Sequence, residues 1–312
     1  MIFKPLRSIE KLLKKVYNFI VSGPSKEAYI TDSSSFSRNR VLTFPVVVST
    51  ILNLFKESVE YNLSLVLPFF NTASSVTGAA FSLARFKIHI SFFKDLNKLL
   101  VDFHHGTHTK LWKGFQLLAA DGSTVSLPAS KQMKDYFGVH SCNNHGVKNC
   151  LAQALMIFDV FTDFVIAGRL SKMENSERTL LDECLETLPQ SKSILLLDRG
   201  FGDFSTLKRL LKYKKDFCVR ISGSSSLFGQ RAIEIVETDV ITDWRPSKKE
   251  KATCCKHNLD YEPIKVRVTR VTLANGEVEL LVSSLCNLKL YSSKDITTLY
   301  ELRWGIEEGY KN

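Results

Sequence analysis

The spacing of apolar residues divides the chain into a helical part and a mixed part. From Phe44 to about His105 the apolar positions recur mostly at helical intervals, with a break near Pro68. Residues 1 to about 40 form a basic amphipathic segment and then a Ser-rich polar run, which predicts a helix followed by a linker. Residues 1–110 are therefore expected to form a helical domain.

Beyond Trp112 the pattern changes to short apolar runs that are typical of strands. A helix is expected after Ser176, which is a good N-cap followed by acidic residues, and Pro189 stops it. The predicted strands are 115–120, 151–159, 164–170, 193–197 and 217–221, and a second helix is predicted at 205–214.

The order three strands, helix, strand, helix, strand is typical of a ribonuclease-H-like fold. We expect an α/β domain with a mixed sheet, in which three antiparallel strands precede a strand-helix-strand unit. Strands predicted at 233–240, 264–273 and 277–286, the last two joined by Asn275-Gly276, indicate a mostly β insertion. The expected divisions are a helical region at 1–110, the first part of the catalytic domain at 111–222, the insertion at 223–293 and a closing helix at 294–312.

Three acidic residues are placed to meet in this fold. Asp121 and Asp198 each end an apolar run, and the strands that carry them are neighbours in the expected sheet. At about 100° per residue, Tyr300, Arg303 and Glu307 fall within roughly 60° of each other on a helix. The sequence therefore predicts a site built from Asp121, Asp198 and Glu307.

The charge of the chain favours a polyanionic partner. Its 42 basic and 32 acidic residues give a net charge of +10, although a solvated basic surface without such a partner remains an alternative. The segment from Ala79 to Phe103 mixes basic and aromatic residues, which fits either a DNA-end contact or core aromatics beside solvated lysines. Seven scattered cysteines, no signal peptide and no apolar run of about 20 residues lead us to expect a cytoplasmic protein without membrane segments.

Three ordered blocks resemble bacterial insertion-sequence transposases of the DDE type, in the IS-four-type branch with the Tyr-Arg-Glu-Lys signature. Asp121-Gly122-Ser123 is similar to the family's first block, and Asp198-Arg199-Gly200-Phe201 with the later Phe217-Cys218-Val219-Arg220 is similar to its second. Tyr300-x2-Arg303-Trp304-x2-Glu307 resembles the third block. The resemblance covers about residues 40–312, including the helical start and the β insertion.

The resemblance implies metal-dependent cleavage and strand transfer at insertion-sequence ends. Asp121 would bridge two Mg²⁺ ions, for which Mn²⁺ is a substitute, while Asp198 and Glu307 each hold one ion. The implied partners are double-stranded DNA with terminal inverted repeats and target DNA, bound by a homodimer. Tyr300 and Arg303 would contact phosphates.

Three further residues keep two interpretations each. Trp304 either stacks on DNA near the cut end or packs against the sheet. Arg199 and Arg220 either contact phosphates or orient the carboxylates.

One feature departs from the family. Its signature Lys lies roughly two helical turns after the Glu, which falls beyond Asn312. We therefore expect a truncated chain. The alternatives are an impaired remnant that still binds DNA ends, or a ribonuclease-H-like nuclease without strand transfer.

A competing metal hypothesis concerns a group of Cys and His residues. Zinc accepts such ligands, but the spacing matches no standard finger. The group is His140-x-Cys142-x2-His145-x4-Cys150, with Cys254, Cys255 and His257 further on.

Overall fold

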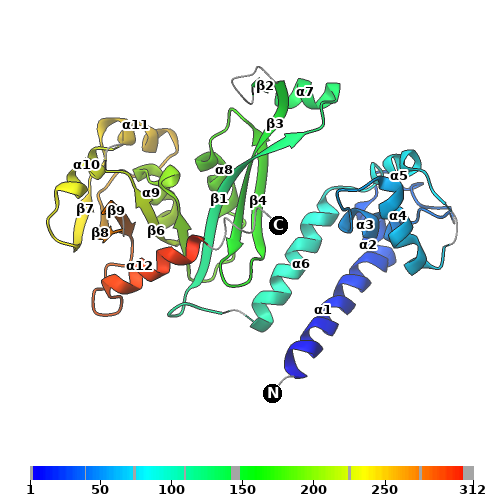
Figure 1. The fold of residues 1–312 in the computed structure, drawn as a ribbon, viewed down its shortest axis with the longest axis horizontal. Coiled ribbons are helices and arrows are strands. Elements are labelled where there is room, and N and C mark those ends of the chain that lie inside the picture. The colour runs from blue at the N-terminus through cyan, green and yellow to red at the C-terminus, as the bar shows by residue number, and fades with distance from the viewer. Residues whose placement is uncertain are drawn as a thin grey trace. The chain divides into compact units, whose positions relative to one another are not determined.

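The computed structural model describes residues 3–38, 40–72, 75–108, 110–141, 148–223, 226–273 and 276–304. The chain forms two units, Met1–Thr109 and Lys110–Asn312. Each unit has its own elements and is described by itself (Figure 1).

The first unit is helical, as the apolar spacing predicts. Its core contains the fully buried rings of Phe44, Phe81 and Phe92, and Phe44 meets Phe92 edge to face at 5.3 Å between ring centres. The predicted break at Pro68 is a short 3-10 turn that ends at Asn71, whose φ of 53° is left-handed. The elements are α1 (Phe3–Val21), α2 (Gly23–Tyr29), α3 (Phe44–Leu52), α4 (Val59–Val66), η1 (Leu67–Phe70), α5 (Gly78–Arg85) and α6 (Ser91–His108).

The second unit is built on one large mixed sheet. Its strands lie in the order β2-β3-β1-β5-β6-β9-β8-β7, and β4 pairs with the far side of β3. The strands are β1 (Gln116–Leu127), β2 (His140–Ser141), β3 (Lys148–Asp159), β4 (Val165–Lys172), β5 (Ser193–Leu197), β6 (Asp216–Ile221), β7 (Asp239–Trp244), β8 (Ile264–Thr272) and β9 (Val278–Ser283).

The order of strands and helices predicted between 115 and 221 is confirmed. β1, β3 and β4 pair antiparallel, whereas β5 pairs parallel with both β1 and β6. The helix after Ser176 is α8 (Glu177–Leu185), and the Ser176 side chain accepts a hydrogen bond from the Thr179 N–H as an N-cap should. The second predicted helix is α9 (Phe204–Lys212). Between β1 and β2 the chain also forms α7 (Lys131–Phe137).

The strand that carries Asp121 is longer than the sequence indicates. Asp-Gly after an apolar run suggests a strand end, yet β1 continues to Leu127 because its antiparallel partner β3 keeps pairing as far as Cys150. The parallel partner β5 stops earlier, at Leu197. Asp121 therefore lies where β1 loses one of its two neighbours.

The insertion extends the same sheet. β9 pairs antiparallel with β6 and is followed by β8 and β7. The strand predicted at 233–240 is wrong, because α10 (Leu227–Glu234) comes first and β7 follows it. Apolar and polar residues alternate around Ile233 as they would in a strand. The segment is helical instead, and α10 buries Phe228, whose ring stacks on Trp244 with 4.1 Å between ring centres. The helix α11 (Lys248–Lys256) lies between β7 and β8.

The last described helix covers one face of the sheet. α12 (Ser293–Glu301) buries Ile296, Leu299 and Tyr300 against alternate residues of β1 and β5, among them Leu117 and Ile194 (Figure 1). α12 begins next to residue 294, where the closing helix is predicted to begin, but the α-helix ends at Glu301 and continues as the 3-10 turn η3 (Leu302–Trp304). Residues 305–312 lie outside the described part.

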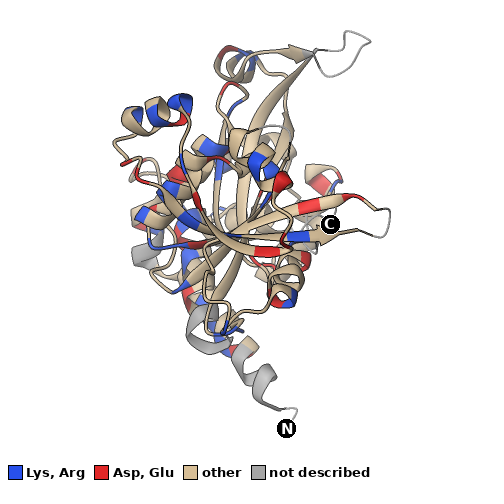
Figure 2. Cartoon of the chain, turned by 90° about the vertical axis from the view of Figure 1, so that its left-hand side faces the viewer, with Lys and Arg blue, Asp and Glu red and all other residues tan. Residues whose placement is uncertain are grey.

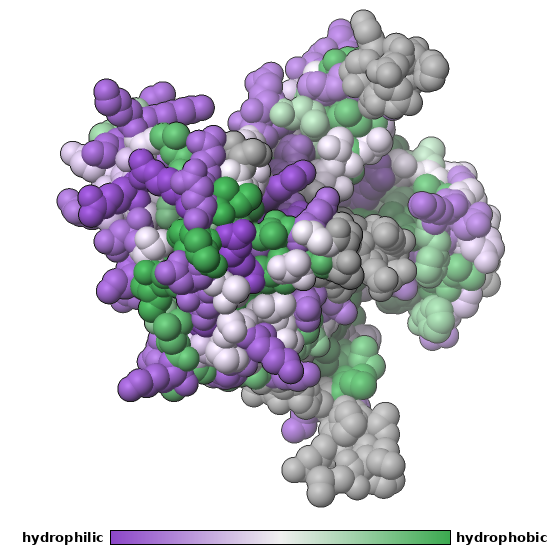
Figure 3. Space-filling model, turned by 60° about the vertical axis from the view of Figure 1, so that its left-hand side comes forward, coloured by the Kyte–Doolittle hydropathy of each residue, from purple (hydrophilic) through white to green (hydrophobic). Residues whose placement is uncertain are grey.

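None of the described helices is long and apolar enough to cross a membrane. Figure 3 shows a mostly hydrophilic face with apolar side chains scattered over it. In Figure 2 the basic and acidic positions are interspersed over the side of the molecule that faces the viewer.

Candidate active site at the ends of β1 and β5

Asp121 and Asp198 lie side by side at the point where the parallel strands β1 and β5 stop pairing. The last residues that pair between β1 and β5 are Ala120 and Leu197, and each aspartate is the next residue of its strand. Leu117 and Ala119 on β1 and Ile194 and Leu196 on β5 share the core that α12 covers. Because side chains alternate along a strand, both aspartates belong to that same face.

Two arginines hold Asp198 as an anion. Arg220 donates from Nη2 to Asp198 Oδ1 at 2.9 Å and from Nη1 to Glu279 Oε1 at 2.6 Å. Burial by itself raises the pKa of Asp198. The Arg199 backbone N–H and the charges of Arg220 and Arg303 outweigh it, so the pKa lies below its ordinary value. Asp198 is therefore ionised at neutral pH.

Glu177 is a third carboxylate near the aspartates, and the sequence did not reveal it. Burial first, and then the negative charge of Asp121, raise its pKa above the ordinary value. Gln153 of β3 donates from Nε2 to Glu177 Oε1 at 3.0 Å. A Cβ on Gly122 would overlap the Glu177 carboxylate, so the glycine after Asp121 makes room for it. In the sequence, Glu177 stands out only as an acidic residue in the first turn of a predicted helix. Favourable interaction with the start of the helix explains such a residue equally well.

Tyr300 and Arg303, from the third block, are buried and lie near Asp198. Tyr300 is 2% exposed and Arg303 is 3% exposed. Burial raises the pKa of Tyr300, and its hydroxyl has no hydrogen-bond partner among the described residues. The charge of Arg303 acts on Asp198. In this arrangement both side chains face the interior next to the carboxylates rather than the solvent.

Two predicted residues of this block are not placed. Glu307 lies outside the described residues. Trp304 is the last residue of η3, and its side chain also lies outside the described part.

Arg199 and Arg220, each with two interpretations from the sequence, differ in their surroundings. Arg199 is exposed in η2 (Arg199–Phe201), directly after Asp198. Arg220 is tied to Asp198 and Glu279, which matches the interpretation that it orients carboxylates.

The donor types at this site suit a hard divalent ion. Carboxylate oxygens are the ligands that Mg²⁺ prefers, and Asp121 and Asp198 present them side by side. Within the described ranges no group of three or more His, Cys, Asp or Glu residues converges closely enough to hold a metal. The described residues therefore form no complete metal site, and the predicted ligand Glu307 lies outside them.

The proposed zinc group is not assembled in the described part of the chain. The ring of His140 shares a hydrogen bond with the Phe137 carbonyl oxygen at 2.9 Å, and Cys150 is buried in β3. Cys142 and His145 lie outside the described residues.

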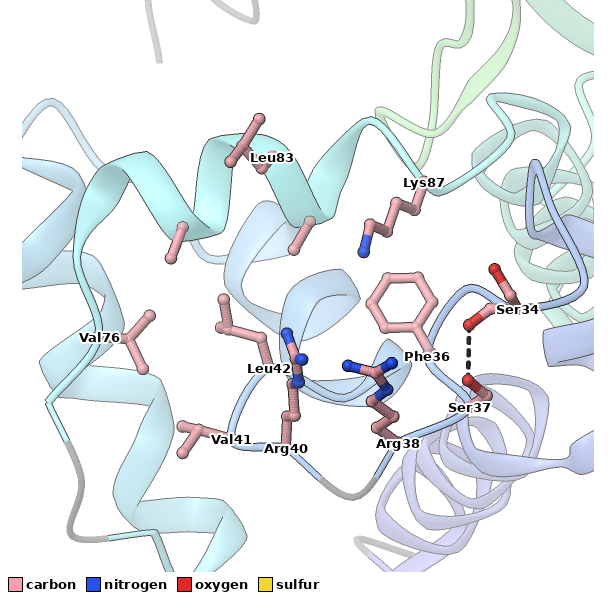
Figure 4. A pocket seen from close by; sticks show the side chains of 12 residues that line it. Ser34, Phe36, Ser37, Arg38, Arg40, Val41, Leu42, Val76, Leu83 and Lys87 are labelled. Atoms are coloured by element: carbon pink, nitrogen blue, oxygen red, sulfur yellow. Dashed lines mark hydrogen bonds between the residues drawn. The ribbon is translucent and has the colours of Figure 1, made fainter.

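The first unit contains a separate hollow with basic residues at its rim. It has a volume of about 800 Å³, and Arg38, Arg40 and Lys87 line it together with Phe36 and Leu83. Figure 4 shows the nitrogen ends of Arg38, Arg40 and Lys87 directed into the same space between α5 and the segment before α3. None of the described residues that line this hollow is acidic.

The family comparison covers the whole of the second unit except its first residues. The model of the transposase DDE domain matches residues 112–312, which is more than half of the chain. A comparison with curated proteins finds no match.

Proposed function

Because the chain belongs to the transposase DDE-domain family, we propose that it is a DNA transposase that cuts DNA at insertion-sequence ends and joins it to target DNA. The observation that carries the proposal is the placement of Asp121 and Asp198 beside each other where β1 and β5 part. Both aspartates lie in the matched region, and both belong to blocks that resemble the family's own.

The strand order supports a ribonuclease-H-like catalytic domain. If the two-residue strand β2 is left out, β4-β3-β1-β5-β6 is the order third, second, first, fourth, fifth along the chain. The first three strands are antiparallel, and the fourth and fifth run parallel to the first. This arrangement places the first and fourth strands together, as the predicted fold requires.

The carboxylates have separate roles in the proposal. Asp121, Asp198 and Glu307 would hold two Mg²⁺ ions, which activate the attacking oxygen and stabilise charge on the phosphate. Arg220 fixes one oxygen of Asp198 and, with Arg303, keeps this carboxylate ionised. Glu177 adds negative charge near Asp121, but it does not converge with the two aspartates closely enough to form a three-carboxylate metal site within the described residues.

The helical first unit would provide part of the DNA contact. Its hollow presents Arg38, Arg40 and Lys87 toward one space with no acidic side chain among the described lining residues. Such a group of cations fits a phosphate of the DNA backbone. The net charge of +10 supports a polyanionic partner for the chain as a whole.

The deciding experiment is Mg²⁺-dependent cleavage of DNA that carries the element's own ends. We expect end cleavage and joined products with the unaltered chain, and neither with Asp198→Asn. Asp135→Asn is the matched control, because Asp135 is exposed on α7, a helix that contributes no residue to the site. Nicked DNA without joined products would instead indicate a nuclease, and end binding without cleavage would indicate a remnant.

A further inference from the structure

A second hollow, in the Lys110–Asn312 unit, is lined in part by Arg199, the residue that follows Asp198. It has a volume of about 850 Å³, and Arg199 and Gly202 from the segment after β5 form part of its wall. Most of the remaining lining comes from the beginnings of the four helices α8, α9, α10 and α11. The lining residues that matter here are Arg178, Arg199, Asp203, Lys248, Lys249 and Glu250. We call this the basic hollow.

The charged side chains of the basic hollow that have no ion-pair or hydrogen-bond partner among the described residues are positive. Asp203 caps α9 and pairs with Arg178, and Glu250 accepts a hydrogen bond from the Ser247 N–H at 2.8 Å. Both acids are thus already engaged. Lys248 and Lys249 are exposed, and neither has an ion-pair partner in the described part of the chain.

Three cations of the basic hollow lie in first helical turns, where positive charge does not stabilise the helix. Lys248 and Lys249 are the first two residues of α11, and Arg178 is the second residue of α8. Positive charge in the first turn opposes the helix dipole. Residues that break a local rule of stability in this way are often kept for function.

The hollow also lies at the edge of the sheet where ligands of α/β proteins bind. α9 follows the carboxyl end of β5, and α10 follows the carboxyl end of β6. Ligands of open α/β sheets bind in the crevice outside the carboxyl ends of the parallel strands. Asp198 lies at this same edge and immediately precedes Arg199.

We infer that the basic hollow binds the phosphodiester backbone of the DNA duplex whose cut phosphate lies at Asp198. The inference rests on the proposed function for the identity of the polyanion. It gives the insertion a role, because α11 contributes Lys248 and Lys249 to the same lining as Arg199 and Gly202. The contact is to phosphates and is independent of base sequence.

The test measures binding of the full chain to a fluorescein-labelled 30-base-pair duplex of arbitrary sequence over a range of KCl concentrations. In K248Q/K249Q we expect Kd to rise about fivefold or more at 0.1 M salt and the salt slope to fall by about two. The Tm of this variant should be unchanged or slightly higher, because the replaced charges oppose the helix dipole.

The matched control removes the same charge from helix ends outside the hollow. Lys212 and Lys256 are exposed in the last turns of α9 and α11, where positive charge is favourable. K212Q/K256Q should bind DNA like the unaltered chain and melt slightly lower. An equal loss of binding in both variants, or no loss in K248Q/K249Q, would overturn the inference. So would tighter binding to an RNA duplex of the same sequence.

The two proposals fail separately. End cleavage that depends on Asp198, combined with unchanged DNA binding by K248Q/K249Q, would support the transposase function and reject the basic hollow as a DNA-binding site. Weakened DNA binding by K248Q/K249Q, with no cleavage by the unaltered chain, would support the basic hollow as a DNA-binding site and reject the transposase function.

Discussion

The carboxylate of Glu177 occupies the space that a side chain on Gly122 would fill. The overlapping atoms are the far end of a flexible side chain, so Gly122→Ala should displace the carboxylate and leave the fold intact. The hydrogen bond from Gln153 to Glu177 would then be lost. We expect an unchanged circular dichroism spectrum and a reduced rate of end cleavage.

A companion variant separates this effect from a general loss of activity. Gly114→Ala has open space around its Cβ but requires a left-handed φ of 87°, so it should lower stability without touching the site. Full cleavage activity in Gly122→Ala would show that the position of Glu177 does not matter.

Glu177→Gln should stabilise the folded chain at neutral pH. Burial and the charge of Asp121 raise the folded pKa of Glu177, so the folded state holds this proton more tightly than the unfolded state does. Ionised Glu177 therefore costs stability above its folded pKa, and the cost disappears as pH falls to the ordinary value of 4.5. The variant's Tm should exceed that of the unaltered chain at pH 7, and the two should converge near pH 4. A constant difference across this range would contradict the assignment.

The two aspartates were predictable because their signal is local. An apolar run followed by Asp indicates a buried strand, and the order of strands then places Asp121 beside Asp198, although β1 itself continues to Leu127. Glu177 gives no such signal. Its position next to Gly122 depends on how α8 packs on β3 and β4, which its own neighbours in the sequence do not indicate.

The terminal segment shows a second limit of sequence patterns. Helical spacing places Tyr300 and Arg303 on one face, but it does not say whether that face meets solvent or the core. The neighbouring Leu299 and Ile296 decide this, because they pack on the sheet and carry Tyr300 inward with them. The change from α-helix to 3-10 turn after Glu301 is likewise invisible in the apolar pattern.

Arg220→Ala should damage both the site and the fold. It would leave Asp198 and Glu279 as neighbouring carboxylates without their shared arginine. Losing hydrogen bonds to charged groups at this partly buried position should cost about 2 kcal/mol of unfolding free energy. Urea unfolding would measure the loss, and Arg220→Lys should recover part of it by keeping the charge. If Arg220 serves only to bind DNA, the alanine variant would instead unfold like the unaltered chain.

Asp295 links the start of α12 to the turn before β1. Its carboxylate accepts from Lys113 Nζ and from the Ser292 N–H, each at 2.7 Å, and these contacts lower its pKa from 3.8 to about 2. Their stabilisation is fully present above pH 3.8 and is lost as pH falls through about 2. Because both side chains are partly exposed, Asp295→Asn should cost about 1 kcal/mol at pH 7. Urea unfolding at pH 7, 4 and 2.5 should show this difference shrinking only in the last step, whereas a difference that persists unchanged at pH 2.5 would assign the stabilisation to capping by either side chain rather than to the charge.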